Sequence, residues 1–101
     1  MTIYEVTINI QQDAATEYEA WLREHIGQML QLQGFLSATW TTAEEAEGGT
    51  VTHCVHYFLR DRDALQHYFL HHAEAMRQEG VRLFGGKFTA TRRVLNVKEQ
   101  W

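Results

Sequence analysis

The feature of this sequence that most limits its fold is the order in which two hydrophobic periods follow each other. Residues 4–10 alternate apolar and polar side chains, which is the period-two pattern of a strand with one apolar face. Between Asp13 and Gly34, apolar residues recur every three or four positions, which predicts an amphipathic helix with Asp13 as its N-cap. The first strand and the first helix therefore share one core.

The remainder of the chain adds a hairpin and then a second helix and strand. Residues 35–42 and 50–59 are rich in Thr, β-branched and aromatic residues, which predicts two strands joined as a hairpin closed by Gly48 and Gly49. Asp61 starts a second predicted helix, whose apolar stripe continues to Leu83. Residues 88–97 are again strand-like, so the elements follow the order β-α-β-β-α-β.

With two right-handed crossovers, this order predicts a ferredoxin-like α+β fold, a four-stranded antiparallel sheet with both helices on one face. A chain of 101 residues has room for one core, so we expect a single domain over residues 1–97 and a tail over 98–101. Trp101 in that tail is either loose or docked on a partner subunit.

The helices leave the second face of the sheet bare. The third and fourth strands carry apolar residues on both sides, so the pattern does not fix which side faces the helices. We predict that a second copy of the chain covers the bare face, giving a homodimer. A solvated, mildly amphipathic face is the alternative.

Composition and charge exclude several classes of function. Lys and Arg total 9 against 13 Asp and Glu, a formal charge of -4, which disfavours nucleic-acid binding. The apolar stretches are shorter than the ~20 residues of a spanning helix, and residues 1–10 lack a basic leader, so we expect no membrane association. The single Cys54 cannot form an intramolecular disulfide, which favours a reducing, cytoplasmic location.

Two of the six histidines stand out as candidate catalytic residues. His25 and His72 each lie in the apolar stripe of a predicted helix, so we expect both to be wholly or partly buried. A buried imidazole needs hydrogen-bond partners, because each unsatisfied group costs about 1–3 kcal/mol. They predict either a pocket in which a histidine acts as acid, base or axial ligand, or two core histidines bonded to backbone or Tyr.

The other histidines give weaker signals. His67 and His71, four residues apart on the second helix, are expected on its solvent side. His53 and His56 point to opposite faces of their strand. Cys54 shares a face with His56, but two ligands are a weak metal signal, so we predict a structural pair and no metal site.

No cofactor motif is present in the sequence. Gly85 and Gly86 lead into a strand instead of following one, so they do not form a phosphate-binding loop. There is no Ser or Cys elbow either. We therefore predict no bound cofactor.

Three arginines are candidate partners of acidic side chains or of an anionic ligand. Arg77, Arg92 and Arg93 are expected to pair with acidic side chains such as Glu79 or Glu5 at the surface. Holding an anionic substrate is the alternative role for these guanidinium groups.

Beyond these patterns, a set of residues spread over nearly the whole chain resembles a bacterial family of uncharacterised small proteins. The residues that carry the resemblance are Trp21, His25-Ile26, Gly34-Phe35, Tyr68, His72-Ala73, Arg77, Phe84-Gly85, Lys87-Phe88 and Arg92. The chain departs from this family at Gly27 and Glu74, where the family has prolines after the two helix motifs.

The resemblance implies membership of the dimeric α/β-barrel superfamily, which includes antibiotic-biosynthesis monooxygenases, haem-degrading enzymes, chlorite dismutases and stress-responsive proteins. It implies a pocket between sheet and helices in each subunit, with the opposite sheet faces paired across the dimer. Haem-degrading members use an Asn, a Trp and a His, for which Asn9, Trp40 and His71 or His72 lie in comparable elements. Asn9 is expected to point away from the helices, which counts against that set.

Two functions remain open, and the sequence does not decide whether the chain is an enzyme. The first is a homodimeric small-molecule-binding or stress-related domain for a small apolar or aromatic ligand. The second is a cofactor-free or haem-dependent monooxygenase acting on an aromatic or tetrapyrrole, with His72 as base or iron ligand. The residues expected to line the pocket or bind the ligand are Trp21, His25, Tyr57, Tyr68, His72 and Arg77.

Overall fold

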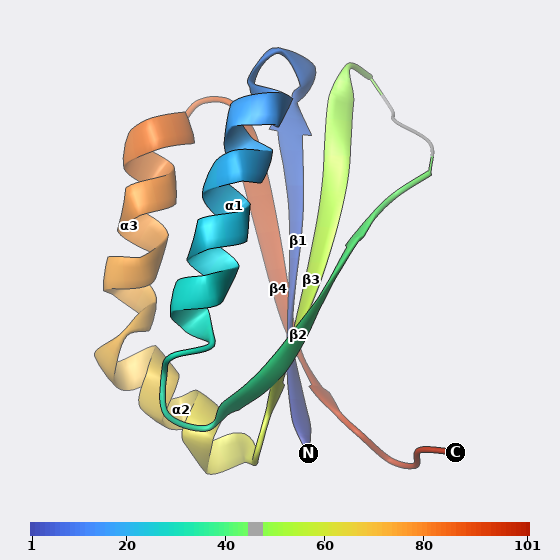
Figure 1. Ribbon diagram of the computed structural model, residues 1–101, viewed down its shortest axis with the longest axis vertical. Coiled ribbons are helices and arrows are strands. Elements are labelled where there is room, and N and C mark those ends of the chain that lie inside the picture. The colour runs from blue at the N-terminus through green and yellow to red at the C-terminus, as the bar shows by residue number, and fades with distance from the viewer. Residues whose placement is uncertain (45–47) are drawn as a thin grey trace.

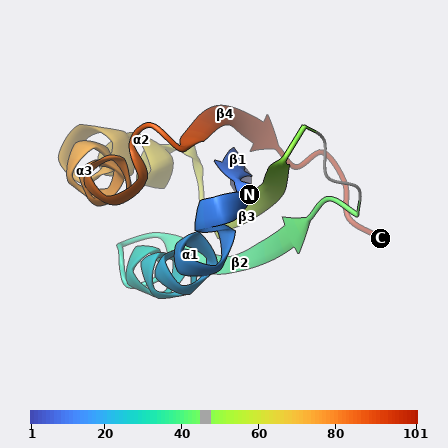
Figure 2. The same cartoon turned by 90° about the horizontal axis from the view of Figure 1, so that it is seen from above.

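The computed structural model describes residues 1–44 and 48–101 and shows the predicted ferredoxin-like α+β fold (Figure 1). Its strands form one antiparallel sheet in the order β2-β3-β1-β4. Seen from above, the helices lie together on one side of the sheet and leave the other side bare (Figure 2). The elements are β1 (Thr2–Gln11), a 3-10 turn η1 (Gln12–Ala14), α1 (Ala15–Met29), β2 (Phe35–Thr42), β3 (Thr50–Leu59), α2 (Arg62–His71), α3 (Ala73–Phe84) and β4 (Phe88–Asn96).

Register between β1 and β3 decides which side chains face the helices. Tyr4 lies opposite Tyr57, and Ile8 lies opposite His53, on the inner face that the helices cover. Glu5 lies opposite His56 on the bare outer face. The sequence pattern did not fix which side of β3 faces the helices. The structure shows that the odd-numbered residues do, since those from His53 to Leu59 are buried.

The core fills the space between the inner face and the helices. Its members are large and almost fully buried, and aromatic rings make up much of the volume. Tyr4 is central, because its ring lies 6.1 Å from that of Tyr57, 5.7 Å from that of Tyr68 and 5.4 Å from that of Phe69. Leu59 and Leu65 are completely buried beside these rings.

The first helix begins later than predicted. Residues 12–14 form the 3-10 turn, and Ala14 takes the N-cap position of α1 without a capping side chain. Asp13, the expected N-cap, lies instead 3.2 Å from the ammonium of Lys87, so its carboxylate pairs with the start of β4. The prediction of Asp13 as cap is therefore wrong.

The second predicted helix is two helices that break at His72. Asp61 caps α2, since its side chain accepts a hydrogen bond of 2.8 Å from the backbone N–H of Ala64. The backbone of His72 has φ -131° and ψ -29°, outside the helical range, and α3 starts at the next residue. Because of this break, the side chains of α3 do not continue the angular spacing of those of α2. The apolar stripe predicted at a constant 100° per residue through both segments is therefore wrong after residue 71.

Glycine is required where α1 turns into β2. Gly34 has φ +86°, and a Cβ at this position would overlap that of Ala64 at the start of α2. Gly48 and Gly49, expected to close the hairpin, also have positive φ values, of 57° and 77°. The preceding part of that connection, residues 45–47, lies outside the described residues.

Beyond the sheet, the last residues extend away from the body of the domain (Figure 1). Trp101 is fully exposed in the single chain. None of the helices in the described part of the chain is long and apolar enough to span a membrane.

Candidate functional site

A cavity lies between α1, α3 and the inner face of the sheet. It has a volume of about 50 Å³. That is room for a few water molecules, but only about a third of the ~150 Å³ in which a benzene ring is known to bind. Its lining is mostly apolar and aromatic and is formed by Tyr4, Val6, Ile8, Tyr18, Trp21, Leu22, His25, Met29, Val55, Tyr57, Tyr68, Met76, Arg77, Gly80, Phe88, Ala90 and Arg92.

Arg77 brings a positive charge into this cavity from α3. One terminal nitrogen, Nη2, donates a hydrogen bond of 2.9 Å to the hydroxyl of Tyr4. The Nε–H of the same guanidinium is buried and has no partner among the described residues. Arg77 was expected to pair with an acidic side chain at the surface, but it has no such ion pair in the part of the chain that the structure describes, and Glu79 accepts a hydrogen bond from Trp21. An unsatisfied buried donor is costly, so this one points to a missing acceptor.

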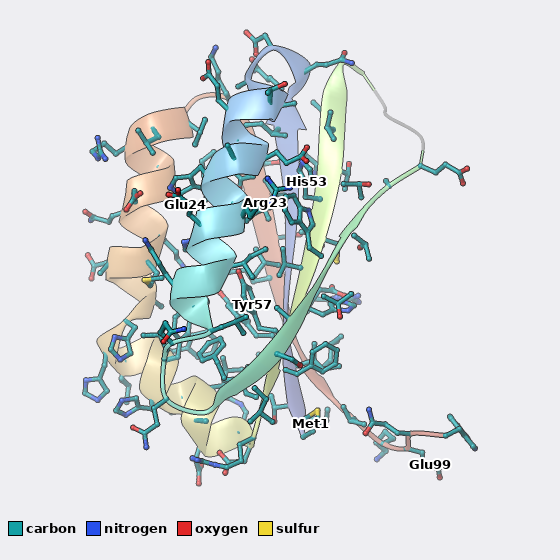
Figure 3. All side chains as sticks on the ribbon, in the orientation of Figure 1. Met1, Arg23, Glu24, His53, Tyr57 and Glu99 are labelled. Atoms are coloured by element: carbon teal, nitrogen blue, oxygen red, sulfur yellow. The ribbon has the colours of Figure 1, made fainter. Side chains whose placement is uncertain are left out.

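Tyr57 and Tyr68 are neutral hydroxyl groups in the cavity wall. Burial raises the pKa of Tyr68 to about 12, and the pKa of Tyr57 is raised further for the same reason. Tyr57 points from β3 toward α1 (Figure 3). At neutral pH these groups offer hydrogen bonds, and they do not act as bases.

His25 and Trp21 form the side of the cavity nearest α3. Their rings stack with centroids 4.6 Å apart, and both side chains are half-buried. The Trp21 Nε1–H donates to Glu79 Oε1 at 3.0 Å, which links α1 to α3. Gly80 faces this indole, because a Cβ there would lie 3.0 Å from the edge of the Trp21 ring.

The environment of His25 favours a neutral imidazole. Burial lowers its pKa, the charge of Glu79 opposes this shift, and the charge of Arg92 adds to it. A neutral imidazole at the edge of a cavity can accept a proton from a ligand, which is the first requirement of a general base.

His72 lies elsewhere, at the break between α2 and α3. Its ring is half-buried, as expected for the residue, but it is not part of the cavity lining. Its neighbours are the rings of His67 and His71, at 5.8 and 6.5 Å. The expectation that His25 and His72 share one pocket is therefore wrong, and the physical reason is the phase change at the helix break.

The residues comparable to those of haem-degrading proteins are not brought together. Asn9 accepts a hydrogen bond of 2.6 Å from Thr52 on the outer face, as its parity predicted. Trp40 lies on the inner face, where its Nε1–H donates a hydrogen bond of 3.0 Å to His53 Nδ1. His53 is labelled in Figure 3. His71 is exposed on α2. These three positions do not surround a common space for a tetrapyrrole.

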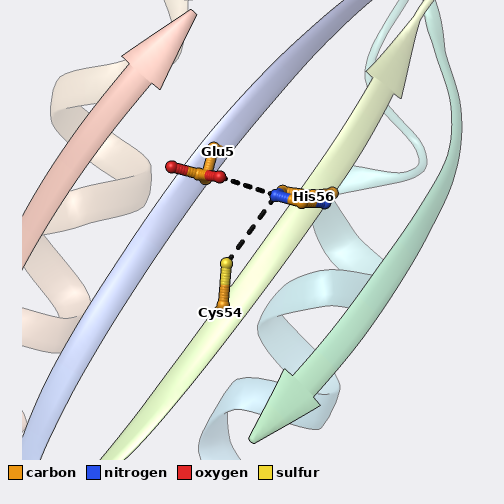
Figure 4. Close-up of side chains that lie close together, drawn as sticks. All are labelled: Glu5, Cys54 and His56. Atoms are coloured by element: carbon orange, nitrogen blue, oxygen red, sulfur yellow. Dashed lines mark hydrogen bonds and ion pairs between the residues drawn. The ribbon is translucent and has the colours of Figure 1, made fainter. Parts of the chain in front are cut away.

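A second cluster lies on the outer face, where Glu5, Cys54 and His56 meet (Figure 4). Glu5 Oε2 is 2.8 Å from His56 Nε2, and Cys54 Sγ is 3.8 Å from the same nitrogen. The other carboxylate oxygen, Oε1, accepts a hydrogen bond of 2.6 Å from Arg93 Nε, which confirms that Arg93 pairs with an acidic side chain. Arg93 and then His56 lower the pKa of the Glu5 carboxyl.

Sequence patterns identified only two members of this cluster. Cys54 and His56 were expected to share a strand face, and they do. Glu5 is 51 residues away from His56, and only the β1–β3 register places them opposite each other. A sequence search that paired polar residues across the two predicted strands would have found the set.

Comparison with known proteins adds a family and a fold. The sequence-family model of DUF4286, a domain of unknown function, matches residues 1–98 of this chain. No curated protein matches the sequence. One solved structure, an antibiotic biosynthesis monooxygenase, has a TM-score of 0.74 at 17% identity and covers 98% of this chain and 100% of its own.

An asparagine-to-alanine variant of SnoaB, a cofactor-independent oxygenase from Streptomyces nogalater, has a TM-score of 0.71 at 13% identity, covering 98% of this chain and 95% of its own. At such identities the likeness shows a shared fold. The predicted relation to an uncharacterised family with the fold of these monooxygenases is therefore confirmed.

Proposed function

Because the chain belongs to the DUF4286 family of domains of unknown function, we propose that it is a small-molecule-binding domain whose cavity holds a flat aromatic ligand with an anionic oxygen. The unpartnered Nε–H of Arg77 inside an aromatic lining is the observation that carries this proposal. A carboxylate or phenolate oxygen would accept that hydrogen bond with the added strength of opposite charges.

The charge of the lining supports an anionic ligand. Arg77 and Arg92 both line the cavity, whereas none of its described lining residues is Asp or Glu. The neutral hydroxyls of Tyr57 and Tyr68 add hydrogen-bonding groups without adding negative charge. An anion therefore finds two guanidinium groups and no repelling carboxylate in the wall.

The size of the cavity requires the wall to move when such a ligand binds. At about 50 Å³ the space is smaller than a single aromatic ring needs. Trp21, His25 and Phe88 are the half-buried aromatic members of the wall. Of these, Trp21 is held by one exposed hydrogen bond, from its indole to Glu79. In this proposal the ligand displaces the Trp21 indole and takes its place beside the His25 ring.

Calorimetric titration with two matched probes tests the proposal. 2-Naphthoate carries the anionic oxygen, and naphthalen-2-ylmethanol has the same rings without the charge. We expect 2-naphthoate to bind at least about tenfold more tightly. Arg77→Met should remove most of this preference, while Arg82→Met, an exposed arginine on the same helix, should keep it. Equal affinities, or no binding of either probe, would overturn the proposal.

A cofactor-free oxygenase is the second candidate, and the placement of His25 favours it. A neutral imidazole at the cavity could take the proton of a phenolic substrate, and the two arginines would stabilise the resulting anion. That anion would supply the electrons to molecular oxygen. The fold shared with a cofactor-independent oxygenase supports this reading.

Oxygen uptake in the presence of 1,4-dihydroxynaphthalene distinguishes binding from catalysis. Catalysis predicts uptake above the rate in buffer, and a loss of that excess in His25→Gln. His67→Gln, which alters an exposed histidine far from the cavity lining, should leave the excess unchanged. Uptake at the buffer rate would leave the binding function and exclude the oxygenase for this substrate.

The same proposal includes a homodimer formed through the outer face. An apolar row crosses that face at one end, where Ile3 lies opposite Phe58 on one side and Leu95 on the other, and all three are half-exposed. Helices cover the inner face only (Figure 2). A partner subunit on this row would bury apolar area that one chain leaves in water.

Native mass spectrometry reports the number of subunits directly. We expect a dimer for the wild type and a monomer for Phe58→Lys, because the lysine places a charge in the apolar row. Leu70→Lys adds the same charge at an exposed position of α2 and should remain dimeric. A monomeric wild type at micromolar concentration would overturn the dimer.

A further inference from the structure

We propose that Glu5, Cys54 and His56 form a binding site for Zn²⁺ or a similar divalent transition metal at the centre of the outer face (Figure 4). The site lies on the opposite side of the sheet from the cavity. The metal proposal therefore does not depend on the ligand-binding function proposed for the cavity. The three residues supply a carboxylate, a thiol and an imidazole, a combination of donors that zinc accepts.

The ligand atoms are already close to the spacing that a metal needs. The carboxylate oxygen, the sulfur and the nitrogen all lie within 4.8 Å of one another. Ligands about 2.0–2.3 Å from a tetrahedral Zn²⁺ lie about 3.3–3.6 Å apart. The observed separations of 2.8 Å from His56 to Glu5 and 3.8 Å from His56 to Cys54 fall on either side of that range. Each of these two separations therefore has to change by about 0.5 Å or less to admit the ion.

Rigid backbone holds the three donors in place. Glu5 comes from β1 and the other two from β3, the two central strands of the sheet. His56 and Cys54 are two residues apart, so both point outward from one strand. Sites built on strands hold their geometry better than sites built on loops.

Arg93 helps to orient the carboxylate. It binds Glu5 Oε1, which leaves Oε2 directed at His56. Such a partner behind a ligand is common at metal sites. When the metal binds, the Cys54 thiol loses its proton to solvent. The hydrogen between His56 Nε2 and Glu5 Oε2 also leaves for solvent, Nδ1 carries the ring proton, and the ion takes the place of that hydrogen.

Cobalt(II) is the probe, because a bound thiolate gives it a near-ultraviolet charge-transfer band. This face also carries the proposed dimer contact, so the metal is equilibrated by overnight dialysis, which lets subunits dissociate and reassociate. We expect one cobalt per chain with that band. Cys54→Ser should remove the band, and Glu5→Gln and His56→Gln should each weaken binding by about tenfold or more.

A matched control separates this site from the other histidines. His67 and His71 have rings 4.4 Å apart on the surface of α2 and could bind cobalt without a thiolate. The His67→Gln/His71→Gln double variant should keep the charge-transfer band. Thermal unfolding adds an independent readout, since Zn²⁺ should raise the melting temperature of the wild type and of this double variant, but not of Cys54→Ser.

The absence of the band in the wild type at saturating cobalt would overturn the site. A band of unchanged strength and affinity in both Glu5→Gln and His56→Gln would also overturn it, because the metal would then sit on the thiol alone.

Discussion

Tyr4 and Glu5 are neighbours in β1, yet they occupy opposite surroundings. The Tyr4 ring lies among three other rings on the inner face, where helices exclude water. Glu5 lies among charged and polar groups on the outer face, with Arg93 and His56 as partners. Inner-face packing determines the fold, whereas the outer face can hold chemistry because the fold depends on it less. Neighbouring positions therefore differ in what substitution does to them.

The largest effect should come from Leu59→Ala on the inner side of β3. Leu59 is 0% exposed, and its truncation leaves a cavity that should cost about 2–5 kcal/mol of unfolding free energy. Leu36→Ala, at a position that is 57% exposed, should cost under about 1 kcal/mol. Urea denaturation measures both, and equal losses would contradict the importance given to inner-face packing.

A smaller loss is expected from Trp40→Phe, which removes one hydrogen bond from the inner face. The Trp40 indole donates to His53 Nδ1, and without it that nitrogen is buried with no donor. The expected cost is about 1–3 kcal/mol by urea denaturation. Trp101→Phe makes the same change at an exposed position and should have no measurable effect. A loss of similar size there would show that the indole itself matters, independent of its partner.

On the outer face, Glu5→Gln should cost less, about 1 kcal/mol at neutral pH. The Glu5 side chain is only 11% exposed, but the glutamine carbonyl can still accept a hydrogen bond, and Arg93 and His56 can turn to water. The variant should also change how the free energy of unfolding decreases at acid pH. The pKa of Glu5 is lowered by folding, so its contribution is present above about pH 4.5 and is lost as the pH falls through the folded-state pKa. In Glu5→Gln that loss is absent. An equal decrease at acid pH in the two proteins would argue against the ion pairs.

The smallest effect should be on the slope of unfolding free energy against pH, at pH values above the range in which Glu5 titrates. Burial lowers the pKa of His53, so between about pH 6.5 and the folded-state pKa the unfolded chain binds a proton that the folded protein resists. Stability should therefore fall as the pH drops through this window. His53→Gln should reduce the slope, with His25 retaining its own contribution because burial also lowers its pKa. Urea titrations at several pH values test this, and an unchanged slope would contradict it.

Most of the fold could be predicted because strand and helix periods are local. The strands at residues 35–42 and 50–59 have the predicted bounds, and the first and last strands agree within two residues at each end. The break at His72 could not be predicted in this way, since no proline or glycine marks it and the apolar spacing continues across it. Because the break was not predicted, His72 was wrongly expected to share a pocket with His25.

The two candidate sites differ in how far sequence could reach them. Trp21 and His25 line the cavity because both belong to the apolar stripe of the first helix. Tyr57 and Arg77 line it as well, although the strand pattern did not fix the face of Tyr57 and Arg77 was expected at the surface. The outer-face cluster depends on a pairing between distant strands, and a pattern within one segment carries no information about that register.

The β1 register also restricts how this chain can vary over evolution. Because β1 is one of the two central strands and pairs with both β3 and β4, deletion of one residue in its middle would turn every later side chain of the strand to the other face. A deletion before Tyr4 shifts the strand as a unit, but one between Tyr4 and Ile8 would bring polar groups into the core. Drift in this strand is therefore confined to substitutions, and an alignment of true relatives should be free of gaps here.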